Sequence, residues 1–260
     1  LLPQGVAPPG PAAPAATAFL GAAPAAGAGP AGTAMFAAHA PPAPRARLLV
    51  ERGEASSGAA FQLSADEVQA GRSQGPVIFP GDPCLAPHHA TFLQRGGALA
   101  VRDEGAAGGI YVRIPQGQAV PLRPGNLFAV GDRLLRFAGP VPAPPPPPPD
   151  GTMRLGAPRP DGAAVLLEEW LEGGVGGRVY LRAGPSITVG RAGCAVNLGD
   201  DGYLSQAHAE IVVEPDGSAS LRDLGSSNGT FLRVAPGGEA PLRDGDELRM
   251  GREVLRVEFR

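Results

Sequence analysis

The chain of 260 residues repeats itself at an offset of about 120 residues, and this repeat constrains its fold more than any other feature. Four blocks recur in the same order. In the first copy they are Gly71-Arg72, Cys84 to Ala90, Val101 to Gly105 and Pro121 to Phe137, and in the second they are Gly190-Arg191, Tyr203 to Ala209, Leu221 to Gly225 and Pro241 to Val257. Solenoid repeats are shorter, about 20–45 residues, so a period this long indicates two copies of one domain.

Composition separates the two copies from the segments around them. Residues 1–44 contain 17 alanines, 10 prolines and no charged side chain, and residues 144–149 are all proline. Segments of this kind bury too little apolar surface to fold alone. We therefore expect a disordered leader over residues 1–45, a first domain over 46–139, a proline-rich linker over 140–160 and a second domain over 161–260.

The proline run predicts an extended connection between the two domains. Polyproline II rises by about 3.1 Å per residue, so six prolines hold their ends roughly 19 Å apart. A ligand for a proline-binding domain is the alternative interpretation. No basic residue adjoins the run, which favours the spacer.

Hydrophobic alternation within each copy is typical of β-strands. Residues 254–259, 209–213, 186–189 and 247–250 all predict short strands, and residues 215–217 predict a hairpin turn. Residues 163–171 fit a helix or a first strand equally well. Turn signals every 8–12 residues are the habit of a β-sandwich, so we expect an all-β protein built from two tandem sandwiches.

The second copy contains polar groups suited to holding a phosphorylated side chain. Arg191 offers a planar, permanently charged fork that can grip a phosphate with two hydrogen bonds. Gly190 lets its loop approach closely, since it has no Cβ. Ser205 supplies a short hydroxyl donor. Each of these residues is common in loops, so only their combination indicates a phosphate-binding site.

A second segment, Ser226-Ser227-Asn228-Gly229-Thr230, adds an amide to this set. An amide both donates and accepts, as the backbone of a bound peptide requires. The Asn-Gly pair is also a common hairpin turn, and both interpretations hold if Gly229 adopts the positive φ that presents Asn228 outward.

Together these motifs resemble the forkhead-associated (FHA) domain, a β-sandwich that binds phosphothreonine peptides through loops at one end. The resemblance is specific over residues 186–252 and covers 161–260 in outline. It implies that Arg191 and Ser205 contact the phosphate, with Gln206 contributing. It also implies that Asn228 fixes the peptide main chain and that Ser227 lies near the phosphate and the threonine methyl.

The resemblance assigns supporting roles to two further residues. His208 is expected to tie the serine-bearing loop to its neighbour, and Asp223 to brace a loop at the end of a strand. His208 has no nucleophile or carboxylate pair beside it, and the chain contains no nucleotide loop or catalytic triad. We therefore expect no enzyme activity and no cofactor.

A rival metal site lies in the first copy. Cys84, His88 and His89 combine ligand types that zinc prefers. However, His89 aligns with His208 and so takes over its structural role, and a fourth ligand is missing because His39 falls in the leader. We expect no bound metal.

The first copy keeps the framework of the second but loses its polar groups. Arg72 is retained, whereas Ala86 stands in place of the serine and Ala106-Ala107-Gly108-Gly109-Ile110 replaces the Ser-Ser-Asn-Gly-Thr segment. Each charge-assisted hydrogen bond contributes about 1.5–3 kcal/mol, so the first copy should not bind phosphopeptides. Arg72 is either a remnant or a docking partner for the second domain.

Charge and cysteine content limit the class of partner. Residues 45–139 carry 10 arginines and 8 acidic residues, and residues 161–260 carry 10 arginines and 16 acidic residues. Neither balance suits nucleic acid. Two cysteines at non-equivalent places suggest a reducing, cytoplasmic setting, and no apolar run suggests a membrane span.

We therefore expect a signalling adaptor that recognises a phosphothreonine-containing protein, either a Ser/Thr kinase or a kinase substrate, while the first domain serves as a non-binding scaffold. The alternative is a phosphate-independent structural or oligomerisation module of a larger assembly. Self-association, or docking between the two domains, is compatible with both hypotheses.

Overall fold

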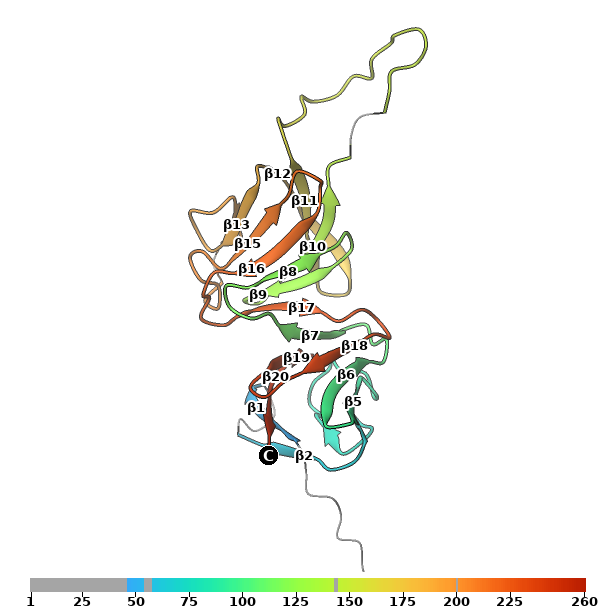
Figure 1. Cartoon of the computed structure of the whole chain (residues 1–260), viewed down its shortest axis with the longest axis vertical. Helices are drawn as coiled ribbons and strands as arrows, with labels where there is room; N and C mark the ends of the chain where they lie inside the picture. Colours follow the sequence, from blue (N-terminus) through green and yellow to red (C-terminus); the bar gives the residue numbers. More distant parts are fainter. Residues whose placement is uncertain (1–45, 54–57, 143–144, 200) are drawn as a thin grey trace, which may run out of the picture. The chain divides into compact units, whose positions relative to one another are not determined.

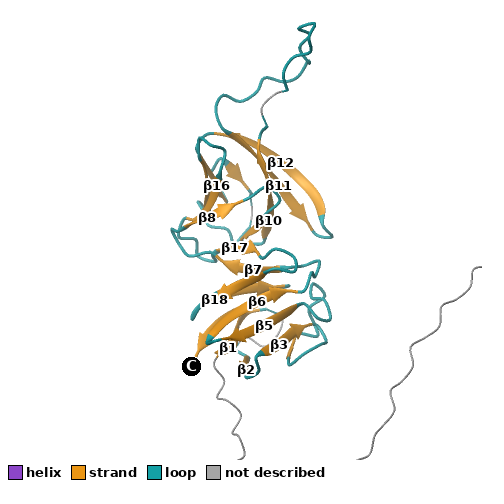
Figure 2. Ribbon diagram, turned by 45° about the vertical axis from the view of Figure 1, so that its right-hand side comes forward, coloured by secondary structure: helices purple, strands orange, loops and turns teal. Residues whose placement is uncertain are grey.

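A computed structural model of the chain describes residues 46–53, 58–142, 145–199 and 201–260. The regular structure in these ranges is entirely β, as Figure 2 shows, so the expected all-β class is confirmed. Within this part of the chain no helix is long and apolar enough to cross a membrane. The leader expected over residues 1–45 lies outside the described residues.

Each repeat supplies ten of the described strands, which follow one another in the same order. Those of the first repeat are β1 (Ala46–Arg52), β2 (Ala60–Leu63), β3 (Glu67–Gly71), β4 (Val77–Ile78), β5 (Ala90–Arg95), β6 (Ala98–Asp103), β7 (Ile110–Arg113), β8 (Ala119–Leu122), β9 (Leu127–Val130) and β10 (Arg133–Pro140). Those of the second are β11 (Ala164–Leu171), β12 (Val175–Ala183), β13 (Ser186–Gly190), β14 (Val196–Asn197), β15 (Ala209–Val213), β16 (Ala219–Asp223), β17 (Thr230–Arg233), β18 (Glu239–Leu242), β19 (Glu247–Met250) and β20 (Glu253–Phe259).

Several strands coincide with those predicted from alternation. The bounds of β15 and β19 are as expected, and residues 164–171 form a strand rather than a helix. In β20, Leu255 and Val257 are fully buried while Arg256 and Glu258 are partly exposed. Phe259, expected on the same inward face, is 39% exposed at the end of the strand.

The two repeats exchange their last three strands. β8 of the first repeat pairs with β16 of the second, and β18 of the second pairs with β6 of the first, as Figure 1 shows. Likewise β10 pairs with β11, and β20 pairs with β1. The two sandwiches therefore do not follow the contiguous ranges 46–139 and 161–260.

We call the two units the first and second sandwich, after the repeat that supplies most of their strands. The first sandwich combines β1–β6 with β18–β20, and the second combines β11–β16 with β8–β10. β7 and β17 lie side by side at the middle of one ten-stranded sheet that runs through both units (Figure 1). A five-stranded sheet covers each half, in the orders β18-β6-β5-β3-β4 and β14-β13-β15-β16-β8.

The hydrophobic cores show the same exchange. The core of the first sandwich contains Phe79 and Phe92 from the first repeat together with Leu248 and Leu255 from the second. The core of the second sandwich contains Phe128 and Phe137 from the first repeat, packed with residues of the second. Because fully burying such a side chain contributes about 1.5–3 kcal/mol, each sandwich depends on both repeats for its stability.

The proline-rich segment does not hold two units apart, and our expectation of a spacer is wrong in this respect. Its two ends meet, because the Val141 amide donates to the Ala164 carbonyl at 2.7 Å and Pro140 pairs with Val165. The strands on either side of the segment, β10 and β11, are neighbours in one sheet. The spacer was expected because the contiguous repeats were taken as separate domains.

Candidate functional site

A shallow pocket of about 310 Å³ lies at one end of the second sandwich. All five residues predicted to bind the phosphopeptide line it, and they come from three separate loops. The lining consists of Arg191, Gly202, Tyr203, Leu204, Ser205, Gln206, Ser227 and Asn228. The fold therefore brings together side chains that are up to 37 positions apart in the sequence.

The first loop follows β13 and carries Arg191. The Arg191 amide donates to the Ser205 carbonyl at 3.0 Å, which fixes the two loops side by side. A Cβ on Gly190 would lie 2.2 Å from the Gln206 carbonyl oxygen, so only glycine permits this approach. The Arg191 side chain is exposed, and its guanidinium forms no ion pair with another described residue.

The second and third loops are joined by hydrogen bonds at the pocket. The Ser227 amide donates to Ser205 Oγ at 3.2 Å, and Asn228 Nδ2 donates to the Tyr203 carbonyl at 2.8 Å. Gly229 has a φ of 78°, the positive value expected for it. The pocket thus presents a guanidinium, a hydroxyl and an amide on a hydrogen-bonded frame.

His208 lies beneath this frame and is fully buried. Its Nδ1 accepts from the Ser205 amide at 3.2 Å, so Nε2 carries the proton and donates to the Gly229 carbonyl at 3.0 Å. Burial lowers the pKa of His208, and the Gly229 contact only partly offsets that effect. The imidazole is therefore neutral near pH 7 and joins the Ser205 loop to the Asn228 loop.

Asp223 organises the third loop from the end of β16. Its carboxylate accepts from the Gly225 and Ser226 amides, both at 2.9 Å, and from the hydroxyls of Ser226 and Thr230 at 2.6 and 2.7 Å. Burial acts to raise the pKa of Asp223, but these hydrogen bonds outweigh it and the pKa is lowered. Asp223 is thus an ionised brace and does not line the pocket.

Asp201 is a supporting residue that our sequence analysis missed. It is 8% exposed, and its carboxylate accepts from the Tyr203 amide and from the Asp132 amide of the first repeat, both at 2.8 Å. Its backbone carbonyl accepts from the Leu204 amide at 3.1 Å. A signal was present, since Asp82 stands at the equivalent place in the first copy.

The equivalent loops of the first sandwich keep the frame without the polar groups. His89 is fully buried, accepts from the Ala86 amide at 3.1 Å and contacts the Gly109 carbonyl at 3.0 Å. The Arg72 amide donates to the Ala86 carbonyl at 2.8 Å. Arg72 itself is exposed and forms no ion pair with another described residue, so nothing in the described structure supports the docking role considered for it.

The described residues contain no group of three or more potential metal ligands placed to hold an ion. Cys84 and Cys194 are both unpaired. His88 contacts Thr91 Oγ1 at 3.0 Å instead of turning toward Cys84 and His89 as a shared ligand.

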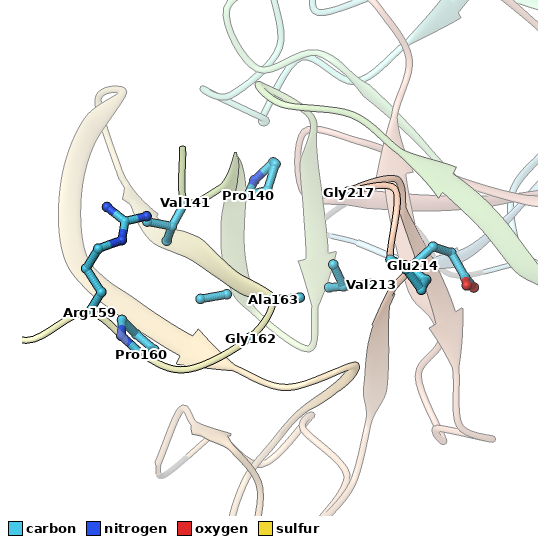
Figure 3. Close-up of a pocket in the computed structure, with 11 residues that line it drawn as sticks. Pro140, Val141, Arg159, Pro160, Gly162, Ala163, Val213, Glu214 and Gly217 are labelled. Atoms are coloured by element: carbon cyan, nitrogen blue, oxygen red, sulfur yellow. The ribbon is translucent and has the colours of Figure 1, made fainter. Parts of the chain in front are cut away.

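A separate hollow of about 230 Å³ lies where the proline-rich loop leaves the second sandwich. Its lining is mostly backbone and small apolar residues, as Figure 3 shows. Figure 3 also shows the Glu214 carboxylate pointing away from Arg159. No residue predicted to be functional lines it, and we do not assign it a ligand.

Comparisons with known proteins match the part of the chain that contains the pocket residues. The family model described as FHA domain matches residues 187–251. The oxoglutarate dehydrogenase inhibitor of Corynebacterium glutamicum is 35% identical over 101 residues, covering 38% of this chain and 70% of that protein. The glycogen accumulation regulator GarA of Mycolicibacterium smegmatis is 30% identical over 116 residues, covering 45% of this chain and 72% of that protein.

Solved FHA structures are similar in sequence to one part of the chain. The FhaA FHA domain, solved with the intracellular domain of Rv3910, is 35% identical, covering 36% of this chain and 97% of that chain with a TM-score of 0.22. A structure concerned with phosphothreonine-dependent FHA domain interactions is 33% identical, covering 34% of this chain and 88% of that chain with a TM-score of 0.21. The two curated relatives, each at least 30% identical and covered over more than two thirds of its length, and the family model together show that the chain belongs to the FHA domain family.

Proposed function

We propose that the protein is a phosphothreonine-binding adaptor in Ser/Thr-kinase signalling, and that it binds through the pocket of the second sandwich. The observation that carries this proposal is the convergence of Arg191, Ser205, Gln206, Ser227 and Asn228 on one pocket. These five side chains combine one permanent positive charge with neutral donors and acceptors, which is the set that a phosphate beside a peptide backbone requires.

The state of Arg191 supports the proposal further. A guanidinium that forms no ion pair with a described residue keeps its charge available for a ligand. The neighbouring loops are already held by His208 and Asp223. The pocket is therefore largely formed before a ligand arrives, which reduces the entropy lost on binding.

The related proteins point to the same class of ligand. One similar FHA structure concerns phosphothreonine-dependent interactions, and another, Mycobacterium tuberculosis EmbR, was solved with a low-affinity phosphopeptide. We propose that the partner of this chain is likewise a phosphorylated protein, either a Ser/Thr kinase or a kinase substrate. A cytoplasmic location is proposed with it, because Cys84 and Cys194 are unpaired.

The first sandwich is proposed to be a scaffold that does not bind phosphopeptides. It retains Arg72 and the buried His89, but Ala86 and Gly108 stand where the second sandwich has Ser205 and Asn228. An alanine methyl and a glycine hydrogen cannot replace the lost hydrogen bonds. The proposal therefore confines phosphopeptide binding to one end of the molecule.

The test is a calorimetric titration of the full chain with a phosphothreonine peptide and with the same peptide unphosphorylated. Only the phosphorylated peptide should bind. Arg191→Ala and Ser205→Ala should each lower the affinity for the phosphorylated peptide by about 10- to 150-fold. This is the equivalent of losing one charge-assisted hydrogen bond of about 1.5–3 kcal/mol. Arg72→Ala is the matched control and should leave the affinity unchanged. Equal binding of the two peptides would instead favour the phosphate-independent module.

A further inference from the structure

We propose that the first repeat completes the phosphopeptide pocket of the second, and that its Gly131–Asp132 turn positions Ser205 by holding Asp201. This inference rests on the proposed function and concerns a part of the chain that lies outside the second repeat. The residues at issue reach the pocket because β8–β10 belong to the second sandwich.

The main contact joins the turn between β9 and β10 to the loop that carries Ser205. The Asp132 amide donates to Asp201 Oδ2 at 2.8 Å, while Asp201 Oδ1 accepts from the Tyr203 amide, also at 2.8 Å. Both oxygens of one buried carboxylate are thus engaged, one by each repeat. Because Tyr203 and Ser205 lie two residues apart and both line the pocket, a shift of Asp201 moves the pocket wall.

The fit at this contact is close. Gly131 has a φ of 58°, and a Cβ there would lie 2.6 Å from Asp201 Oδ2 and 3.2 Å from the Leu204 amide nitrogen. A side chain on Gly131 would therefore push directly against the loop that carries Ser205. The equivalent turn of the second repeat, Gly251–Arg252, lies instead against Asp82 of the first sandwich.

Three other contacts bring the first repeat to the same loops. The Gly117 amide donates to the Asp223 carbonyl at 3.0 Å. The Arg113 side chain lies where a Cβ on Gly229 would stand, with Nε 2.2 Å from that position. The Arg52 guanidinium lies over the ring of Tyr203, 4.8 Å from its centroid. Every loop of the pocket except the one carrying Arg191 is therefore in contact with the first repeat.

The exchange offers a matched pair of variants, Gly131→Val and Gly251→Val. Both glycines have positive φ, 58° and 59°, and a Cβ on either would collide with an aspartate carboxylate. The two variants should lose similar stability. Gly131→Val should lower the affinity for the phosphothreonine peptide by at least about tenfold and speed hydrogen exchange of the amides of residues 201–206. Gly251→Val should instead speed hydrogen exchange of the amides of residues 82–86 and leave the peptide affinity within about twofold of the wild-type value.

The opposite result would overturn the proposal. If Gly251→Val disturbs the 201–206 amides and Gly131→Val does not, the second repeat completes its own pocket. Equal effects of the two variants would also overturn it. If both variants fold poorly, Asp201→Asn and Asp82→Asn replace them, since asparagine adds no bulk, keeps one accepting oxygen and loses the other, and the same contrast is expected.

Cysteine pairs test the exchange without any ligand, in a Cys84→Ser and Cys194→Ser background. Ala119 and Arg222 are partners in the β8–β16 ladder. Pro121 has no backbone N–H, so the Ser220–Pro121 pair must be a non-hydrogen-bonded pair of this antiparallel ladder. Pairs alternate along the ladder, so the Ala119–Arg222 pair, two positions away, is also non-hydrogen-bonded, and its Cα atoms should be about 4.5 Å apart. That separation falls within the range of roughly 4.4–6.8 Å that disulfides require.

Ala119→Cys with Arg222→Cys should therefore form a disulfide within one chain, seen on a non-reducing gel as a monomer band whose mobility changes when the disulfide is reduced. Glu239→Cys with Arg222→Cys is the control, because Glu239 has the place of Ala119 in the other repeat. A disulfide in the control pair alone, or a covalent dimer from the first pair, would overturn the proposal. If the wild-type chain binds no phosphopeptide, the proposed function fails, while hydrogen exchange and the cysteine pairs still decide whether the first repeat holds the loop.

Discussion

Val112 lies directly opposite Leu232 in the ladder between β7 and β17, and the two residues occupy equivalent places in their repeats. On either side, Tyr111 pairs with Arg233 and Arg113 pairs with Phe231, so the register is symmetric about that pair. The two repeats are therefore related by an approximate two-fold axis at Val112 and Leu232. Such symmetry is the arrangement of an isologous dimer, here formed within one chain.

This relationship predicts that the chain stays together when its proline-rich loop is cut. A protease site inserted between Gly151 and Gly156, where the described residues are exposed, should be cleaved readily. The two fragments should then elute as one species on size exclusion, because each core contains side chains from both repeats. Fragments that separate in native buffer would contradict the exchange. A cut chain analysed in denaturant provides the control.

A second prediction concerns the closest backbone approach at the pocket. Gly190→Ala introduces a Cβ that would lie 2.2 Å from the Gln206 carbonyl oxygen, so the Arg191 and Ser205 loops must move apart. We expect a stability loss of about 1–3 kcal/mol and at least a tenfold loss of phosphopeptide affinity. Chemical denaturation and calorimetry measure the two effects.

Gly71→Ala is the matched control, since its Cβ would lie 2.3 Å from the Pro87 carbonyl oxygen in the first sandwich. It should lower stability by a similar amount and leave affinity nearly unchanged. If Gly71→Ala lowered the affinity for the phosphopeptide as much as Gly190→Ala does, the loss of affinity would reflect general destabilisation.

The two buried histidines predict a pH dependence of stability. Burial lowers the pKa of His89 and of His208 below the value near 6.5 that both have in the unfolded chain. Below pH 6.5 the unfolded state therefore binds more protons than the folded state. The stabilisation is fully present above that pH and is lost as the pH falls toward the folded pKa values.

Thermal unfolding between about pH 7.5 and 5 measures this loss, with the pH window set by the unfolded histidine pKa. His208→Gln should lower the stability at pH 7.5 and reduce its dependence on pH, and His89→Gln should do the same. A pH profile unchanged in both variants would show that other groups cause the dependence. The two variants differ in one respect, since only His208→Gln should also lower the affinity for the phosphopeptide.

The pocket was largely predictable from the sequence, whereas the exchange was not. Arg191, Ser205 and Asn228 belong to short motifs whose chemistry can be recognised locally. The partner of a strand cannot be recognised in this way. Pro121-Leu122 and Pro241-Leu242 carry the same residues, so either segment satisfies the pattern needed beside β6 or β16.

The exchange of strands also explains the error over the proline-rich segment and the omission of Asp201. A spacer is the natural interpretation when contiguous repeats are taken as domains, but Val141 and Ala164 are hydrogen-bonded neighbours. Asp201 makes its decisive contact with Asp132, 69 residues away in the other repeat. Long-range pairing of this kind leaves no local periodicity in the sequence.

The most direct test of the account is an NMR titration of the ¹⁵N-labelled full chain with a phosphothreonine peptide. We predict that the backbone amides of Arg191, Ser205 and Asn228 shift on binding, because these residues line the pocket. The amides of Arg72, Ala86 and Gly108, at the equivalent places of the first sandwich, should not shift. Shifts confined to the first sandwich, or no shift at either end at millimolar peptide, would contradict the account.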